Sequence, residues 1–189
     1  MDKFIADVHF GHFGVIEFDD RPFSSVEEMD DAMIKLWNEN VYYDDNVWIV
    51  GDFCYHSAEP PEWYLSKLRG VKHLIVGNHD ISLLKNKKAL GYFEDVKQSI
   101  VLNLNGQMVH ICHFPMAEWN GMYHGWWHMY GHLHNSNNEA QQFMLRKERA
   151  LNISACVLRY TPRDFNSVIQ RNKEWRGSLV GMHDVAEIK

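Results

Sequence analysis

The feature that most constrains this chain is a series of five short polar clusters, each placed at the end of a short apolar run. The first three clusters close the apolar runs at 4–8, 47–50 and 71–76. Buried strands of an open α/β sheet have this appearance, and such sheets carry their sites at the carboxyl ends of the strands. The sequence therefore predicts an α/β fold. In chain order the clusters are Asp7-Val8-His9, Gly51-Asp52, Gly77-Asn78-His79-Asp80, His113 and Gly131-His132-Leu133-His134.

Helices are expected between these strands. Ser24 or Ser25 can cap the first helix, whose apolar residues follow helical spacing as far as Trp37. Proline at the start predicts a helix over 60–68, and a further helix is expected over 81–90. The alternation of strand and helix supports the α/β class.

The second half of the chain has a different pattern. Asn105-Gly106 separates strand-like runs at 96–104 and 108–113, which predicts an antiparallel hairpin. Thr161-Pro162 is expected to open a last helix through about Trp175, with Thr161 as cap and Pro162 at the first position. Further strands are expected over 127–132 and 151–156.

The length and composition set outer limits. A chain of 189 residues fits one domain, expected over 1–176, followed by a tail over 177–189. The net charge of -6 argues against non-specific nucleic-acid binding, which depends on Lys and Arg. Three cysteines without a CxxC spacing indicate neither a disulfide framework nor a zinc knuckle, so a reducing cytoplasm is expected. No apolar run approaches the ~20 residues of a membrane helix, and the short stretch before Asp7 leaves no room for a signal peptide.

The polar clusters contain the donors of a cation site. Side chains two residues apart on a strand share a face, so Asp7 and His9 can reach one cation, as can His132 and His134 on extended backbone. Each of these pairs also occurs by chance, so neither is decisive alone. Gly77 permits a sharp turn that presents the amide oxygen of Asn78 as a neutral ligand.

His79 and Asp80 suggest catalysis. A histidine beside the cations is a natural general acid for a departing alkoxide, and Asp80 could orient its ring. Asp80 could equally cap the following helix, Asp52 could be a turn residue, and His113 could be an ordinary histidine at the end of a strand. Five such clusters in one order favour a site for two cations.

This ordered set resembles the signature of the calcineurin-like metallophosphoesterases: DxH, GD, GNHD, H and GHxH. His9-Phe10-Gly11-His12 is also similar to the HFGH of small single-domain bacterial and phage members. The resemblance implies an α/β sandwich of two mixed β-sheets flanked by helices. It also implies one metal on Asp7, His9 and His134, a second on Asn78, His113 and His132, and Asp52 bridging both.

By the same resemblance, a water or hydroxide between two divalent metals would be the nucleophile, and His79 would protonate the leaving oxygen. His12 would contact substrate or support the metal ligands. Manganese is the expected metal, with Fe, Zn, Co or Ni as alternatives.

One departure narrows the expected substrate. Protein phosphatases of this superfamily carry an Arg shortly after the second-motif Asp, whereas Phe53-Cys54-Tyr55-His56 follows Asp52 here. We therefore expect a phosphodiesterase that acts on a small substrate rather than a protein phosphatase. A broad phosphomonoesterase and an inactive interaction module remain alternatives, and the oligomeric state is open. A nuclease is a further alternative that is not favoured, since only two short basic stretches would serve it: Lys85, Lys87 and Lys88, and Arg146, Lys147 and Arg149.

Overall fold

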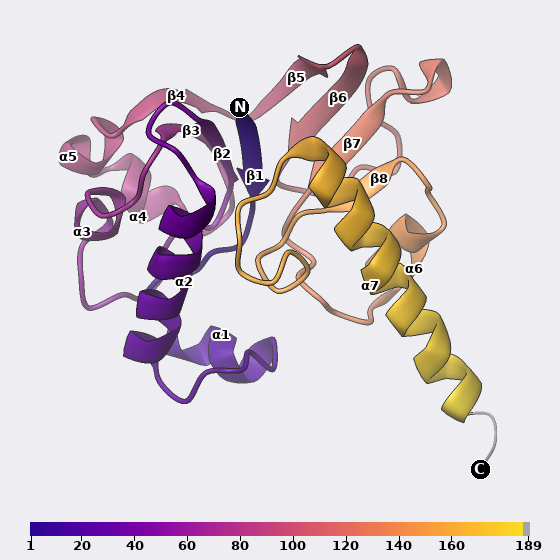
Figure 1. Cartoon of the computed structure of the whole chain (residues 1–189), viewed down its shortest axis with the longest axis horizontal. Helices are drawn as coiled ribbons and strands as arrows, with labels where there is room; N and C mark the ends of the chain where they lie inside the picture. Colours follow the sequence, from indigo (N-terminus) through magenta and orange to yellow (C-terminus); the bar gives the residue numbers. More distant parts are fainter. Residues whose placement is uncertain (187–189) are drawn as a thin grey trace.

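The computed structural model describes residues 1–186, with side chains described through residue 179. Within these residues the chain forms two four-stranded sheets that pack against each other and are flanked by helices (Figure 1). The expected sandwich of two sheets is therefore confirmed.

The first sheet contains β1 to β4 in sequence order, and every neighbouring pair is parallel. The runs that precede Asp7, Asp52 and Asn78 form its first three strands, so these residues follow the carboxyl ends of adjacent strands. Only the second sheet is mixed, which refines the expectation of two mixed sheets. The strands of the first sheet are β1 (Asp2–Ile5), β2 (Asn46–Val50), β3 (Val71–Ile75) and β4 (Phe93–Lys97).

The second sheet begins where the chain leaves the first. The run expected as one strand over 96–104 is divided, because β4 pairs with β3 whereas β5 pairs with β6. Asn105 and Gly106 both have positive φ, as a two-residue hairpin turn requires, so the hairpin is confirmed. Strands β6, β7 and β8 then pair in parallel. The strands are β5 (Ser99–Leu104), β6 (Gln107–Cys112), β7 (Trp127–Tyr130) and β8 (Ala150–Asn152).

Alternation along the strands explains the layers. Side chains on one strand point to opposite faces in turn, and both faces of the first sheet are covered. Ile49 packs in the core beneath the helices, whereas its neighbours Trp48 and Val50 pack in the core between the sheets. A smaller cluster that includes Tyr130 and Met144 lies elsewhere on the second sheet. The apolar runs in the sequence are therefore strands with two buried faces.

Five helices accompany the first sheet. Ser25 accepts a hydrogen bond from the backbone N–H of Glu28 and so caps α2, as expected. The helix expected over 81–90 is divided into two, because the side chain of Asn86 caps a new helix. The helices of this part are α1 (Phe13–Phe18), α2 (Val26–Asn40), α3 (Pro61–Leu65), α4 (Ile81–Leu84) and α5 (Lys87–Leu90).

The last helix begins later than expected. Arg163 and Phe4 exchange backbone hydrogen bonds of 2.8 and 3.1 Å, which keeps the chain extended through Arg163. Asp164, not Thr161, accepts the hydrogen bond from the N–H of Ser167, so the assignment of Thr161 as cap is wrong. Helix α7 (Phe165–Ala186) runs past Trp175 into the expected tail, and residues 187–189 lie outside the described residues.

Two shorter helical segments, the 3₁₀ turn at Met122–His124 and α6 (Glu139–Leu145), lie in the second half. The division into a domain and a tail stays a prediction. None of the helices in residues 1–186 is long and apolar enough to cross a membrane.

Candidate metal centre

The backbone at five residues of the first, second and fifth polar clusters is left-handed rather than extended. Asp7 and His9 each have φ of 53°, and Asp52, His132 and His134 have φ of 56°, 66° and 49°. The sequence argument that these pairs share the face of an extended strand is therefore wrong. Residues other than glycine avoid this region, and clusters of such residues are typical of functional sites.

Hydrogen bonds hold this backbone in place. The N–H of Asp7 donates to the carbonyl of Gly51 at 3.0 Å, and that of His9 donates to the carbonyl of Asp52 at 2.9 Å. The first cluster is thus fastened to the second. The N–H of His132 donates to both carboxylate oxygens of Asp7 at 3.0 Å, which brings the last cluster to the first.

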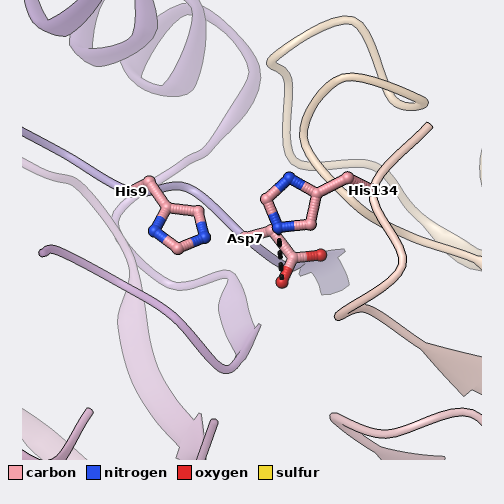
Figure 2. Close-up of side chains that lie close together, drawn as sticks. All are labelled: Asp7, His9 and His134. Carbon is pink, nitrogen blue, oxygen red and sulfur yellow. Dashed lines mark ion pairs between the residues drawn. The ribbon is translucent and has the colours of Figure 1, made fainter. Parts of the chain in front are cut away.

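Asp7, His9 and His134 form one possible metal-binding group. One donor atom from each lies within 4.8 Å of the others, and Figure 2 shows the His134 ring directly above the Asp7 carboxylate, with the His9 ring to the left. Nε2 of His134 lies 3.8 Å from Oδ1 of Asp7. In the described structure both ring nitrogens of His9 are buried without a hydrogen-bond partner. Such groups are costly unless something binds them, so the donor set fits a cation.

A second group lies beside the first. The amide oxygen of Asn78 lies 3.0 Å from Nε2 of His113 and 2.9 Å from Nδ1 of His132. Oδ2 of Asp52 lies 3.5 Å from Nε2 of His113 and 3.6 Å from Nε2 of His9. One carboxylate oxygen therefore faces a nitrogen of each group.

Two of the histidines have a defined tautomer. Nδ1 of His113 lies 2.9 Å from the carbonyl oxygen of Val50, which can only accept, so this nitrogen carries the proton. Nδ1 of His134 likewise donates to the carboxylate of Asp19 at 2.8 Å. In both rings Nε2 keeps its lone pair for the site, as metal-binding histidines require.

Burial and neighbouring charges shift the pKa values of these groups. Burial lowers the pKa of His9 well below the usual value and lowers that of His132, so both imidazoles favour the neutral form that binds metal. Burial also lowers the pKa of His134, but the hydrogen bond to Asp19 and the charge of Asp7 outweigh it and raise the pKa overall. Burial raises the pKa of Asp52 to about 6, against the opposing effect of His113. A cation beside Asp52 would favour its ionised form.

Two glycines of the motifs leave space for these side chains. A Cβ on Gly131 would lie 2.6 Å from Cβ of Ala6 and 2.7 Å from Oδ2 of Asp7. A Cβ on Gly51, where φ is 83°, would overlap the imidazole of His113. Glycine is therefore required for close approach at both positions, and at Gly51 also for the backbone.

Asp80 does not orient His79, which corrects the expected role. Its buried carboxylate accepts hydrogen bonds from the N–H groups of Gly77 at 2.8 Å and of Asp52 and Phe53 at 3.0 Å. It makes no capping bond to α4 either. Asp80 instead joins the second cluster to the third.

His79 is held by other contacts. Its N–H donates to Oδ1 of Asp52 at 2.8 Å. The centroid of its ring lies 4.1 Å from that of Tyr55 and 5.6 Å from that of His9. The ring of His79 therefore lies next to the metal-type ligands without belonging to either group.

These side chains surround a cavity of about 300 Å³. His12 is part of its lining, and its ring centroid lies 5.6 Å from that of His9. Asp7, Asp80 and His113 are fully buried. The residues that line the cavity are His9, His12, Val15, Phe18, Asp52, Asn78, His79, His132 and His134.

Sequence reasoning missed the residues that support the ligands. Asp19 accepts from His134 and from Nε and Nη2 of Arg21, the latter two at 3.1 Å. Arg21 in turn donates to the carbonyls of Asp7 and Val8, both at 2.9 Å. Asp19 is 115 residues from His134 in sequence, so no local spacing could have paired them.

Two further residues, at the end of β8 and just after it, donate hydrogen bonds to the ligand residues Asp7 and His134. The hydroxyl of Ser154 donates to Oδ2 of Asp7, and the amide of Asn152 donates to the carbonyl of His134 at 2.7 Å. Both residues are buried. In the sequence both residues fall within the run 151–156, which was expected only to form a strand.

The chain is similar to other proteins in sequence and in structure. An uncharacterized protein of Methanocaldococcus jannaschii, MJ1445, is 30% identical over 168 residues, which cover 88% of each chain. The Gene 66 protein of Mycobacterium phage L5 is 38% identical over 80 residues, 41% of this chain and 38% of the phage protein. The crystal structure of AQ665 from Aquifex aeolicus, a protein of unknown function, has a TM-score of 0.67 at 21% identity and covers 86% of this chain and 94% of that one.

The sequence profile described as calcineurin-like phosphoesterase matches residues 3–167. This range contains all five clusters and both sheets. The chain therefore belongs to the calcineurin-like phosphoesterase family and is a metal-dependent phosphoester hydrolase.

Proposed function

We propose that this protein is a phosphodiesterase that hydrolyses a small diester at a centre of two divalent metal ions. The observation that carries the proposal is the composition of the cavity wall. Five histidines, Asp52 and Asn78 line it, and among the described residues neither Lys nor Arg does so. A phosphate diester bears one negative charge, which the cations can compensate without a basic side chain.

The two groups described above supply the donors for these ions. One ion would be held by Asp7, His9 and His134, and the other by the second group, which contains Asn78, His113 and His132. Asp52 would bridge them, in keeping with its Oδ2 lying within 3.6 Å of a nitrogen from each group. Divalent cations held there would polarise the phosphoryl oxygens and activate a water nucleophile near neutral pH.

His79 would donate the proton to the leaving oxygen. Its ring lines the cavity, while its backbone N–H is fixed by the carboxylate of Asp52. The neighbouring ring of Tyr55 restricts its orientation, a role first expected of Asp80. His12 would contact the bound diester on the same wall.

Two alternatives are less well supported. A nuclease would need a basic groove, but Arg149 lies over Trp127, Lys147 lies over Phe143, and Lys88 lies 3.7 Å from Glu62. None of these basic residues lines the cavity in the described structure. An inactive interaction module would not be expected to keep every ligand.

The size of the cavity supports a small substrate. A volume of about 300 Å³ is at the lower end of the range for small-molecule sites. The donors suit manganese, which we propose first, as well as Fe, Zn, Co or Ni. We also propose a cytoplasmic location.

The test compares bis(p-nitrophenyl) phosphate with p-nitrophenyl phosphate. Protein stripped with a chelator is reloaded with Mn, Zn, Fe or Mg, and kcat/KM is measured for both esters. Metal-dependent turnover that favours the diester is the expected result. Preference for the monoester would refute the diesterase proposal in favour of a phosphomonoesterase, and turnover by the stripped protein would refute the metal requirement.

A further inference from the structure

Helix α1 gives the cavity an apolar wall. Two of its six residues, Val15 and Phe18, are part of the lining. Val15 is buried, whereas Phe18 is 74% exposed. The ring of Phe18 lies at 90° to the imidazole of His134, with 5.8 Å between the centroids. An aromatic surface is therefore open to solvent immediately beside a metal-type ligand.

The residues on either side of α1 connect this wall to the candidate metal centre. His12 precedes α1 and lines the same cavity, and Asp19 follows α1 and accepts the hydrogen bond from His134. Arg21 holds Asp19 from the other side. The contacts that orient His134 therefore also fix the end of the helix that carries Phe18.

Exposure alone would not indicate a binding site, because single apolar residues are common on protein surfaces. Phe13 illustrates this, since it is 69% exposed on the same helix but does not line the cavity. Phe18 differs because it lies where a substrate would sit. Most of the remaining wall is imidazole, carboxylate and amide, so Phe18 and Val15 are the apolar part of the site.

We propose that Phe18, backed by Val15, binds a planar aromatic ring carried by the substrate, either an aryl group or the base of a nucleoside. This inference rests on the proposed diesterase function. Stacking on an aromatic side chain accepts any ring with a π face, which suits both sources of the ring.

The ring belongs to the ester group that stays on phosphorus. His9 is in ring contact with both His134 and His79, at 5.1 and 5.6 Å between centroids. Phe18 packs against His134, whereas the proposed acid His79 packs against Tyr55. Phe18 and the proposed acid thus pack against different side chains, so we place the retained ester group at Phe18 and the leaving group at His79.

Three diesters with the same leaving group, p-nitrophenolate, test this assignment. The retained ester group is methyl, phenyl or thymidine 5′-yl. For the wild-type protein we expect a higher kcat/KM with a retained ring than with methyl. In Phe18→Ala this preference should fall about tenfold, within the range that loss of one stacking contact produces. The phenyl to thymidine ratio identifies the source of the ring.

Phe13→Ala is the matched control, because it removes an equally exposed ring from the same helix. It should keep the wild-type preference. The comparison uses the ratio of kcat/KM for two esters on one protein preparation, so a difference in metal loading between variants does not affect it. An unchanged ratio in Phe18→Ala, or an equal loss in Phe13→Ala, would overturn the proposal.

A binding measurement separates this inference from the proposed function. Phenylphosphonate and methylphosphonate are titrated into the metal-loaded protein and followed by calorimetry. If no ester is hydrolysed, the diesterase proposal fails, but tighter binding of phenylphosphonate that depends on Phe18 would still support the ring site. Equal affinity for the two phosphonates would refute it.

Discussion

Asp19 offers the most direct test of how the metal centre is held. Its side chain and that of Arg21 are both fully buried, and they lie 3.1 Å apart. Asp19 also accepts the hydrogen bond from Nδ1 of His134 and so fixes the tautomer of that ring. Asp19→Asn keeps the size of the side chain but removes its charge. Nδ1 of His134 lies 2.8 Å from both carboxylate oxygens, so the N–H₂ that replaces either oxygen would place a donor against the Nδ1 proton.

The structure indicates the size of two separate effects. Removing one partner of a buried ion pair costs about 3 to 5 kcal/mol, because the other charge is left uncompensated. We expect the lower end, about 3 kcal/mol, because Arg21 keeps two backbone carbonyl acceptors. Loss of the carboxylate behind a metal-binding histidine weakens metal affinity about 10- to 100-fold.

These effects are measured separately. Urea unfolding of chelator-treated protein reports the change in stability, and competition with a chromophoric chelator reports metal affinity. Asp20→Asn is the matched control, since the neighbouring residue is exposed and loses the same charge. If Asp19→Asn and Asp20→Asn bind metal equally well, Asp19 does not orient His134, and the reasoning is refuted.

Three further predictions concern single side chains. Asp52→Asn should lose bound metal and turnover, because Asp52 Oδ2 faces both ligand groups; full metal content by elemental analysis with a normal rate would exclude the bridge. His79→Ala should keep its metal but slow turnover of an ester with a poor leaving group by roughly 10² to 10⁴, and a normal rate would rule out the acid role. Burial lowers the pKa of His128 in the folded protein to about 4, whereas its pKa in the unfolded chain is 6.5. As the pH falls below 6.5, the unfolded chain therefore binds a proton that the folded protein does not. Stability should therefore drop by about 3 kcal/mol between about pH 7 and about pH 4, measured by urea unfolding without metal, and His128→Gln should lack this component; the same pH dependence in both proteins would contradict it.

The sequence predicts the sandwich because its strands are buried on both faces. Continuous apolar runs such as 47–50 can be recognised without any tertiary information. The hairpin at Asn105-Gly106 is equally local, since its turn type depends on two residues. The passage of the chain from the first sheet to the second between Lys97 and Ser99 cannot be predicted from local sequence. It depends on which strand β4 and β5 each pair with.

The members of the metal centre could be predicted for a similar reason, but their geometry could not. Motif order identifies Asp7, His9 and His134 as donors that lie near one another. It does not show that their backbone is left-handed, because φ at these positions is imposed by partners distant in sequence. The role of Asp80 was wrong for the same reason, since its carboxylate accepts hydrogen bonds from backbone N–H groups and does not orient His79.

The supporting residues explain how this backbone can persist. A residue other than glycine at positive φ costs of order 1 to 3 kcal/mol unless its surroundings hold it there. Arg21 binds the carbonyl of Asp7, Asp80 binds the N–H of Asp52, and Asn152 binds the carbonyl of His134. All three are buried, so each contact is protected from competing water. The ligands are therefore oriented by a second set of polar side chains that never reach the cavity, and replacing one of these should weaken metal binding while every ligand is still present.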